Sequence, residues 1–584
     1  MCLRHHIGRP NSGTRVVRVV LVLLLGCFLS YSARSQDLES SVGERPVRLD
    51  GSVSISVNKY SVSGGPARRP ATGWTFVGAP TLSFYGVSLP FSFILSDQES
   101  SFRQPFDQVG VSPQYKWVTL HLGYRSLTYS KYTLAGITFL GAGVDLDPNP
   151  LRLSFMYGRF QRAVEEDTTN IAVQPAFKRM GLAGKIGYGT DESFVDLIYL
   201  HAKDDSASLT HIPTRVNIFP EENTVLGINT KIKIIEPLTF DAEIASSFLT
   251  RDLRSPLIDS SQIPNSLKWV IDTRSSTSLL LASTTGLTLR VPHFNIRLGY
   301  ERVEPDYASL GAYYFTTDIE NYTIAPSFDA FSNKLRMSGA IGIQNDNVLD
   351  TKLARTQRII GSGNISINPA QVFGIDMNYA NYSTQQGTSA KSNLINDSTR
   401  VSSVAQSASV TPRFLFVSNI STQSIILSAS YQDYTDQNIF TQKYSNSKTT
   451  SGTINYNITF LRSALSLGAS LLIADTKQSA SSTALRGITF NGAKSLVENR
   501  LSIGGSIGYT RSSVEIAGST VPPIPSISTT SNTYSESLNS TFRISDQGTF
   551  VFTLYATETN TSVSGTPAFT EILATLTYTH NFSF

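Results

Sequence analysis

The sequence predicts an all-β fold, a single large antiparallel transmembrane β-barrel of about 24 to 26 strands. Period-two alternation of apolar and polar residues extends from residue 49 to the end of the chain. Short and long connecting segments alternate through more than half of the chain. No apolar run after Ser35 reaches the roughly 18 residues that a membrane helix requires, and a closed barrel is the other structure that satisfies every backbone group in a bilayer.

The composition excludes several other classes of protein. Of 584 residues, 40% are hydrophobic and only 16% are charged, which disfavours a helical bundle or a coiled coil. The chain has 48 Lys and Arg against 44 Asp and Glu, and five of the arginines lie in the first 35 residues, which contain no acid. The remainder is close to neutral and lacks the clustered basic residues of a nucleic-acid-binding surface, so we expect no nucleic-acid partner.

Residues 1–35 have the pattern of a cleaved signal peptide. A basic stretch is followed by the apolar run Val19–Leu29 and by small residues around a cleavage site after Ser35. The apolar run is too short to span a bilayer. We therefore expect a short N-terminal segment over residues 36–48 and the barrel over residues 49–584.

Both cysteines of the chain, Cys2 and Cys27, lie in this signal peptide. Cys27 stands in a loose match to a lipid-attachment site, but the apolar run continues at Phe28 and Leu29, where lipoproteins usually turn polar. We expect a mature chain that begins at Gln36, carries no lipid and contains no disulfide, thiolate metal site or cysteine nucleophile. An acylated Cys27 in an intact-mass measurement would contradict this expectation.

One hairpin shows the alternation clearly enough to predict its register. A two-residue turn at 292–293 places the apolar residues of both strands opposite one another. The expected pairs are Val291 with Phe294, Leu289 with Ile296 and Leu287 with Leu298 on one face, and Arg290 with Asn295 and Thr288 with Arg297 on the other. Such a contrast between faces is typical of a half-buried soluble sheet or of a wall between lipid and water.

The connecting segments distinguish these two alternatives. Short links are expected near 236–237, 292–293, 369–371, 417–422, 462–463, 498–499 and 545–547. Longer links, rich in Ser, Thr, Asn, Asp and Pro, are expected near 251–275, 304–318, 346–356, 384–399, 435–447, 477–484 and 514–530. Outer-membrane barrels alternate short periplasmic turns with long external loops, whereas a β-sandwich has no reason to keep this order. The rhythm is least regular between residues 97 and 150.

The final strand carries a resemblance to a known class of proteins. Its alternating stripe consists of Ile572, Ala574, Leu576, Tyr578, His580, Phe582 and the terminal Phe584. The stripe resembles the C-terminal signal of bacterial outer-membrane β-barrel proteins, with His580 in place of the usual apolar residue. The Ser, Thr, Tyr and Gly content is similar to that of Bacteroidota-type barrels.

The resemblance has implications for location and partners. It implies that the barrel-assembly machinery recognises Leu576, Tyr578, Phe582 and Phe584. It also implies that the chain is exported to the bacterial outer membrane, where it contacts lipid.

No motif supports an enzyme, a metal site or a cofactor. Gly504–Gly508 matches a serine-hydrolase pattern but lies within a period-two strand, where Ser506 is expected to be a small lumen-side residue. Asp145–Asn149 has the opening spacing of a calcium loop without its later Gly and Glu, so we expect a turn. The five histidines after residue 35 include no close pair. We predict no enzymatic activity, no catalytic residue, no metal and no cofactor.

The size of the predicted barrel suggests a channel or a translocation pore, because barrels of about 16 to 18 strands already enclose water. Only about a dozen residues separate Gln36 from the first predicted strand, too few for a globular plug. Long loops, or a plug or secretion partner, would then close the lumen. The alternative is a non-conducting structural or partner-binding barrel whose external loops are the working surface.

Segment 251–275 is the loop that we expect to fold inward and constrict the pore. Its basic residues are Arg251, Arg254, Lys268 and Arg274. It also contains the apolar group Trp269–Ile271, and burying one such side chain stabilises by roughly 1.5 to 3 kcal/mol. Glu301 is the candidate acidic partner on the wall. An external loop that packs on its neighbours or binds a partner is equally compatible with this composition.

Overall fold

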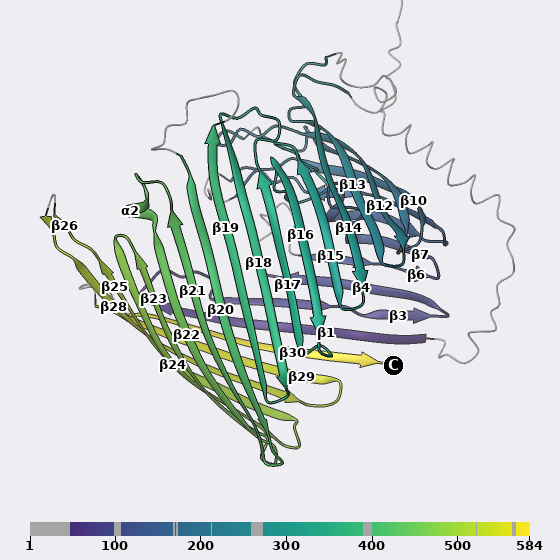
Figure 1. The fold of residues 1–584 in the computed structure, drawn as a ribbon. Helices are drawn as coiled ribbons and strands as arrows, with labels where there is room; N and C mark the ends of the chain where they lie inside the picture. The colour runs from purple at the N-terminus through teal and green to yellow at the C-terminus, as the bar shows by residue number, and fades with distance from the viewer. Residues whose placement is uncertain are drawn as a thin grey trace, which may run out of the picture.

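The computed structural model describes residues 47–97, 107–167, 170, 173–211, 213–258, 272–388, 400–520, 523–562 and 568–584. The expected signal peptide and nearly all of the short N-terminal segment lie outside these ranges. The described chain is almost entirely β-strand and forms a closed antiparallel barrel (Figure 1). Helix α2 (Gln442–Ser445) is a single turn within a loop. In the described ranges, no helix has the length and apolarity to cross a membrane.

The strands follow one another around the wall in chain order. The first half consists of β1 (Val47–Ser63), β2 (Thr72–Gly78), β3 (Thr81–Phe84), β4 (Val87–Ser96), β5 (Gln108–Val111), β6 (Gln114–Tyr115), β7 (Val118–Thr128), β8 (Ala135–Leu146), β9 (Leu151–Gln161), β10 (Lys178–Gly189), β11 (Phe194–Asp205), β12 (Glu222–Ile235) and β13 (Leu238–Thr250).

The second half continues in the same order. It consists of β14 (Thr277–Val291), β15 (Phe294–Val303), β16 (Ile319–Ala330), β17 (Leu335–Asn345), β18 (Ala354–Ala370), β19 (Phe373–Thr388), β20 (Ser402–Val417), β21 (Ser421–Asp436), β22 (Ser447–Phe460), β23 (Leu465–Gln478), β24 (Ser481–Leu496), β25 (Leu501–Ile516), β28 (Ile527–Arg543), β29 (Gly548–Thr561) and β30 (Phe569–Ser583). β26 (Ser519–Thr520) and β27 (Pro523–Ile524) form a separate small hairpin.

The barrel sheet contains 28 strand segments, of which two pairs are interrupted strands. β2 and β3 both pair with β1, and β5 and β6 both pair with β7. The wall therefore has 26 strands, which confirms the predicted fold class. The interruption between β5 and β6 lies in the region where the sequence rhythm is least regular.

The first and last strands close the barrel. β1 pairs with β30 in an unbroken ladder from Asp50 opposite Ser583 to Ser63 opposite Thr570. In Figure 1 the purple β1 lies beside the yellow β30. Closure removes the free sheet edges that would otherwise expose unpaired backbone groups.

The connections confirm most of the predicted rhythm. Every predicted pair of the hairpin around 292–293 is present, and His293 provides the left-handed turn conformation with φ 65°. The prediction of a long link at 477–484 is wrong, because β23 ends at Gln478, β24 begins at Ser481 and only two residues join them. Ser and Thr are common there because the hairpin is exposed to water, whether its backbone is strand or loop. A short turn at 331–334 is missing from the predicted links, since Phe331 continues the apolar pattern into the turn.

The hydrogen-bond register determines which side chains face inward. Residues that pair directly across an antiparallel ladder share a face. Four residues that pair across the ladder, Ala245, Ala282, Val303 and Ile319, are buried. They lie beneath two loops, residues 129–134 and 304–318, which contact strands from β12 to β15. A segment can contact so many strands of a closed wall only from its concave side, so this row and its continuation around the ladder face the lumen.

The outward face is an apolar belt. Its exposed members include Val57, Ile186, Leu197, Ile228, Ile244, Leu298, Ile324, Ile341, Ile359, Ile454, Leu471, Phe490, Ile507, Leu538 and Leu576. These positions share the outward face in the register around the ladder. Such a surface is unfavourable in water and favourable in lipid.

Aromatic side chains border this belt on both sides. On the side of the short turns, Phe373 lies 5.2 Å from Phe414 and Phe550 lies 4.7 Å from Tyr578, measured between ring centroids. On the side of the long loops, Tyr300 and Tyr322 lie 5.0 Å apart. About six to eight residues separate the two borders along a strand, or roughly 20 to 26 Å, which at a tilt of about 40° gives an apolar band roughly 15 to 20 Å high.

A carboxylate joins two of the long loops, residues 162–177 between β9 and β10 and residues 206–221 between β11 and β12. Glu166 accepts hydrogen bonds from the backbone N–H groups of Thr214 and Arg215, both at 2.9 Å. These bonds lower the pKa of Glu166 to about 2. A lowered pKa means that the contact is fully present above the ordinary carboxyl range and is lost as the pH falls toward 2.

Replacing the Glu166 carboxylate is expected to release the loop of residues 206–221 from its contact with residue 166 at neutral pH. In Glu166→Gln, an amide cannot accept both backbone bonds with the strength of a charged group. Trypsin should then cleave after Arg215 faster than in the wild-type protein, measured by mass spectrometry of a limited digest. Glu236→Gln, in a short turn at the opposite end of the barrel, is the control. Equal cleavage rates in all three proteins would show that the contact does not hold the loop.

Candidate functional site in the lumen

Two loops fold into the barrel and cover part of its inner wall. They are residues 129–134, between β7 and β8, and residues 304–318, between β15 and β16, together named the inner plug. Their side chains Tyr132, Leu134 and Tyr307 are almost completely buried. They form one apolar cluster with inward residues of the wall, among them Met156, Ile198, Leu200, Val225, Leu249 and Leu280.

Buried hydrogen bonds anchor the inner plug to the wall. Glu243 of β13 accepts from the backbone N–H groups of Lys131 at 3.2 Å and Tyr132 at 2.7 Å. Asn223 of β12 accepts from the backbone N–H of Leu310 at 3.0 Å. Because an unpaired buried polar group is costly, these bonds hold both loops in one position.

A further bond joins the two loops to each other. The hydroxyl of Tyr307 donates to the carbonyl oxygen of Tyr132 at 2.7 Å. Burial raises the pKa of Tyr132 and of Tyr307, so both hydroxyls remain protonated donors. The two loops therefore form one unit.

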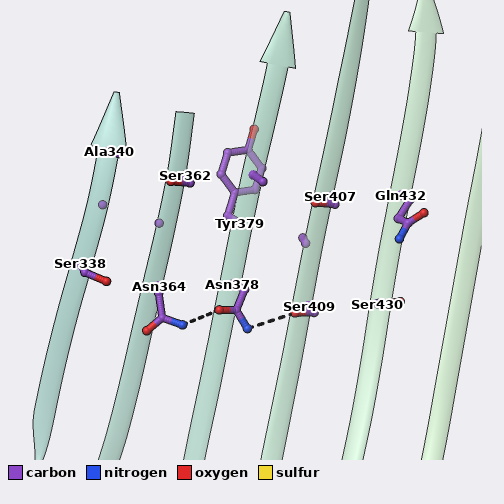
Figure 2. Close-up of a pocket in the computed structure, with 14 residues that line it drawn as sticks. Ser338, Ala340, Ser362, Asn364, Asn378, Tyr379, Ser407, Ser409, Ser430 and Gln432 are labelled. Carbon is purple, nitrogen blue, oxygen red and sulfur yellow. Dashed lines mark hydrogen bonds between the residues drawn. The ribbon is translucent and has the colours of Figure 1, made fainter. Parts of the chain in front are cut away.

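The opposite half of the lumen, from β17 to β30 and β1, presents many small uncharged polar groups. One inward row passes through Ser338, Asn364, Asn378, Ser409 and Ser430 on five successive strands. Figure 2 shows Asn364 donating to Asn378, which donates to Ser409 at 3.3 Å. These residues line a hollow of about 560 Å³ in the wall.

Similar hydroxyl pairs recur along this half of the wall. They include Ser506 with Ser537 at 2.7 Å, Thr533 with Thr559 at 3.1 Å and Ser56 with Thr577 at 2.8 Å. The inward orientation of Ser506 agrees with its expected role as a small lumen-side residue. These hydroxyl and amide groups can therefore hydrogen-bond solutes without attracting either sign of charge.

Several charged groups on the inner wall of the other half are paired with each other. Arg297 binds Asp241 through two hydrogen bonds of 2.6 and 2.7 Å. Farther along, Asp145 contacts His121 at 2.9 Å, and Arg152 contacts Asp196 at 3.2 Å. Asp145 is the second-last residue of β8, and the turn expected from the sequence follows over residues 147–150. Paired charges contribute little net field to the lumen.

The described basic residues of segment 251–275 lie near one another without meeting Glu301. Arg251 lies 3.8 Å from Asp306 of the inner plug. Arg254 contacts Asp252 at 3.0 Å, and Arg274 donates to the carbonyl of Ser255 at 2.7 Å. Lys268 and Trp269–Ile271 lie outside the described residues.

The described parts of this segment extend the β13–β14 hairpin, with Leu257 bridged to Arg274. Glu301 faces the lumen and binds Lys131 together with the Tyr132 hydroxyl, the latter at 2.6 Å. The inward fold of residues 251–275 therefore stays a prediction.

Sequence reasoning missed the loops that do form the inner plug. Segment 304–318 carries Tyr307, Leu310 and the aromatic run Tyr313–Phe315, the same signal of large apolar residues in a long link that singled out 251–275. Segment 129–134 is short enough to pass for an ordinary turn. Its partners Glu243 and Glu301 are more than a hundred residues away in the chain.

The residues of the terminal stripe lie on the outward face of β30. Leu576 and Phe584 are exposed, and Tyr578 packs against Phe550. His580 lies between Tyr578 and Phe582, with ring centroids 6.2 and 6.1 Å away, so it continues the aromatic row in place of an apolar residue.

No group of three or more His, Cys, Asp or Glu side chains suited to a metal ion occurs in the described part of the chain. No known family model matches the chain, and no curated protein matches it.

Solved structures with a similar fold include Pseudomonas aeruginosa OccK8 (OprE), with 13% identity over 57% of this chain and 94% of that chain and a TM-score of 0.32. The FrpB iron transporter of Neisseria meningitidis is 9% identical over 94% of this chain and 82% of that chain, with a TM-score of 0.39. These likenesses concern the barrel fold alone.

The contact between Glu301 and Lys131 leads to a prediction about ion selectivity. In Glu301→Gln the charge of Lys131, whose side chain is 55% exposed, loses its partner and faces the lumen. The reversal potential in a KCl gradient should shift toward anions, by only a few millivolts because salt screens a charge beyond about 10 Å at 0.1 M. Glu498→Gln, in a short turn, is the control. A shift toward cations would contradict the assignment.

Proposed function

We propose that this protein is a channel of the bacterial outer membrane. The observation that carries this proposal is a closed 26-strand wall, apolar outside and polar inside, in which the inner plug covers one half. At about 4.8 Å per strand and a tilt of about 40°, a circular wall of this strand number is roughly 50 Å across its backbone. Two loops of this size leave room for a passage along the Ser, Thr and Asn wall.

The chemistry of the lumen favours transport over catalysis. Most of the inward charges named above are paired, and hydroxyl and amide groups are frequent on the open wall, so we infer passage of polar solutes without strong ion preference. Membrane lipid around the apolar belt and the barrel-assembly machinery at the terminal stripe are the proposed partners. We infer no enzymatic activity.

Planar lipid bilayers test the proposal directly. Purified protein that shows heat-modifiable migration, the sign of a folded barrel, should produce stepwise increases in current. Weak ion selectivity is expected in a KCl gradient. Correct insertion without conductance would contradict the channel and favour a non-conducting barrel that binds a partner through its external loops.

A further inference from the structure

We propose that Tyr313 and Tyr314 form a lumen binding platform for a neutral oligosaccharide. Both belong to the inner plug, yet 66% of Tyr313 and 84% of Tyr314 is exposed. They border a hollow of about 470 Å³ that Lys131, Glu301 and Gln344 also line. This proposal rests on the channel function and names the class of solute.

The platform is held in place on both sides, so the exposure of its rings does not come from a loose loop tip. Before it, the carbonyl of Gly311 accepts a hydrogen bond from the backbone N–H of Ala135 at 3.0 Å. After it, Phe315 packs against Tyr307, with ring centroids 5.4 Å apart. The hydroxyl of Tyr313 accepts a bond from the backbone N–H of Thr138 at 3.3 Å. A fixed platform loses little conformational freedom when a ligand binds.

The residues of the hollow match the two kinds of surface that a sugar presents. A pyranose ring has faces of C–H groups, which pack on an aromatic ring, and hydroxyl groups at its edge, which need donors and acceptors. Tyr313 and Tyr314 provide the rings, and their hydroxyls together with the amide of Gln344 provide polar partners. The hollow is also within the size range of small-ligand sites, about 300 to 1,000 Å³.

The charges of the hollow favour a neutral ligand. Lys131 and Glu301 form an ion pair, and Glu301 also accepts a hydrogen bond from the hydroxyl of Tyr132. Lys131 and Glu301 are the charged residues that line the hollow, so an ionic solute would have to break this pair to find a counter-ion there. Farther along the same wall, beginning on β17, the row of Ser338, Asn364 and their neighbours offers further uncharged hydrogen-bonding groups, which suits the same class of solute.

Current block by maltoheptaose, a neutral linear oligosaccharide, tests the platform. Added to wild-type channels in a planar bilayer, it should interrupt the ion current in a saturable manner, and the acidic tetragalacturonate should do so less. In the double variant Tyr313→Ala, Tyr314→Ala the affinity should fall about tenfold. Tyr555→Ala removes an inward tyrosine of β29 that is 47% exposed and far around the wall from Gln344 of β17, and its affinity should stay within about twofold of the wild type.

The outcomes separate this inference from the channel function. A conducting channel that maltoheptaose does not block, or a block that the double variant leaves unchanged, would overturn the platform and leave the channel intact. A protein without conductance would contradict the channel, and the platform is then tested by titrating detergent-solubilised protein with maltoheptaose while recording tyrosine fluorescence. Saturable quenching in the wild type that is lost in the double variant supports the platform, and absence of quenching overturns it.

Discussion

Changing Tyr578, Phe582 and Phe584 together to Ser is expected to block insertion into the outer membrane. These aromatic residues belong to the outward stripe of β30, and Tyr578 packs against Phe550 of the neighbouring strand. Each replacement removes roughly 1.5 to 3 kcal/mol of stabilisation that comes from burying an apolar side chain. The loss falls on the strand that closes the barrel against β1.

The variant should accumulate as a protease-sensitive periplasmic species, measured by fractionation, protease treatment and heat-modifiable migration. The matched control changes Thr575, Thr577 and Thr579, the inward residues of the same strand, to Ser and should insert normally. A normal outer-membrane level of the aromatic variant would show that the terminal stripe does not direct assembly.

Replacing residues 305–317 by a short Gly-Ser linker is expected to raise single-channel conductance by a factor of about two or more. This segment supplies most of the inner plug, including Tyr307 and Leu310, and its removal widens the passage. The linker also exposes apolar wall residues such as Leu200 and Val225, so the variant is first checked for heat-modifiable migration. Shortening the loop around α2, whose contacts are with β21, is the control and should leave conductance unchanged.

A milder change tests the same loop without removing it. Asn223→Ala removes the acceptor of the Leu310 backbone N–H, a loss of about 1 to 3 kcal/mol for a buried group. Larger current fluctuations are expected, because residues 304–318 are held less firmly.

Unchanged conductance in a correctly inserted variant with the linker over residues 305–317 would show that the inner plug does not constrict the passage. The same linker placed over residues 255–270 tests the constriction predicted for segment 251–275.

Much of the wall could be predicted from the sequence because its physics is local. A strand between lipid and water must alternate, so Leu287–Val291 and Phe294–Leu298 determine their own register once the turn between them is short. The stripe that ends at Phe584 likewise shows its outward face without any knowledge of its neighbours. Strand number follows from the same alternation and from the rhythm of the links.

The positions at which strands end or are interrupted were predicted less well. Ser and Thr occur wherever the chain meets water, so composition did not distinguish the tight turn between β23 and β24 from a long loop. The interruption between β5 and β6 falls at Ser112 and Pro113, where proline lacks the backbone N–H that a ladder requires, a signal that sequence reasoning missed.

The sequence by itself determined the all-β class, a range of about 24 to 26 strands, the alternating faces and the terminal stripe, since each depends on residues only a few positions apart. The tertiary structure alone decided which loops enter the lumen and which side chains they expose there. Tyr132 meets Glu243 and Glu301, and Leu310 meets Asn223, only after 26 strands have closed into a wall. An apolar loop residue becomes buried only where the closed wall presents a matching apolar surface, and no local pattern specifies that match.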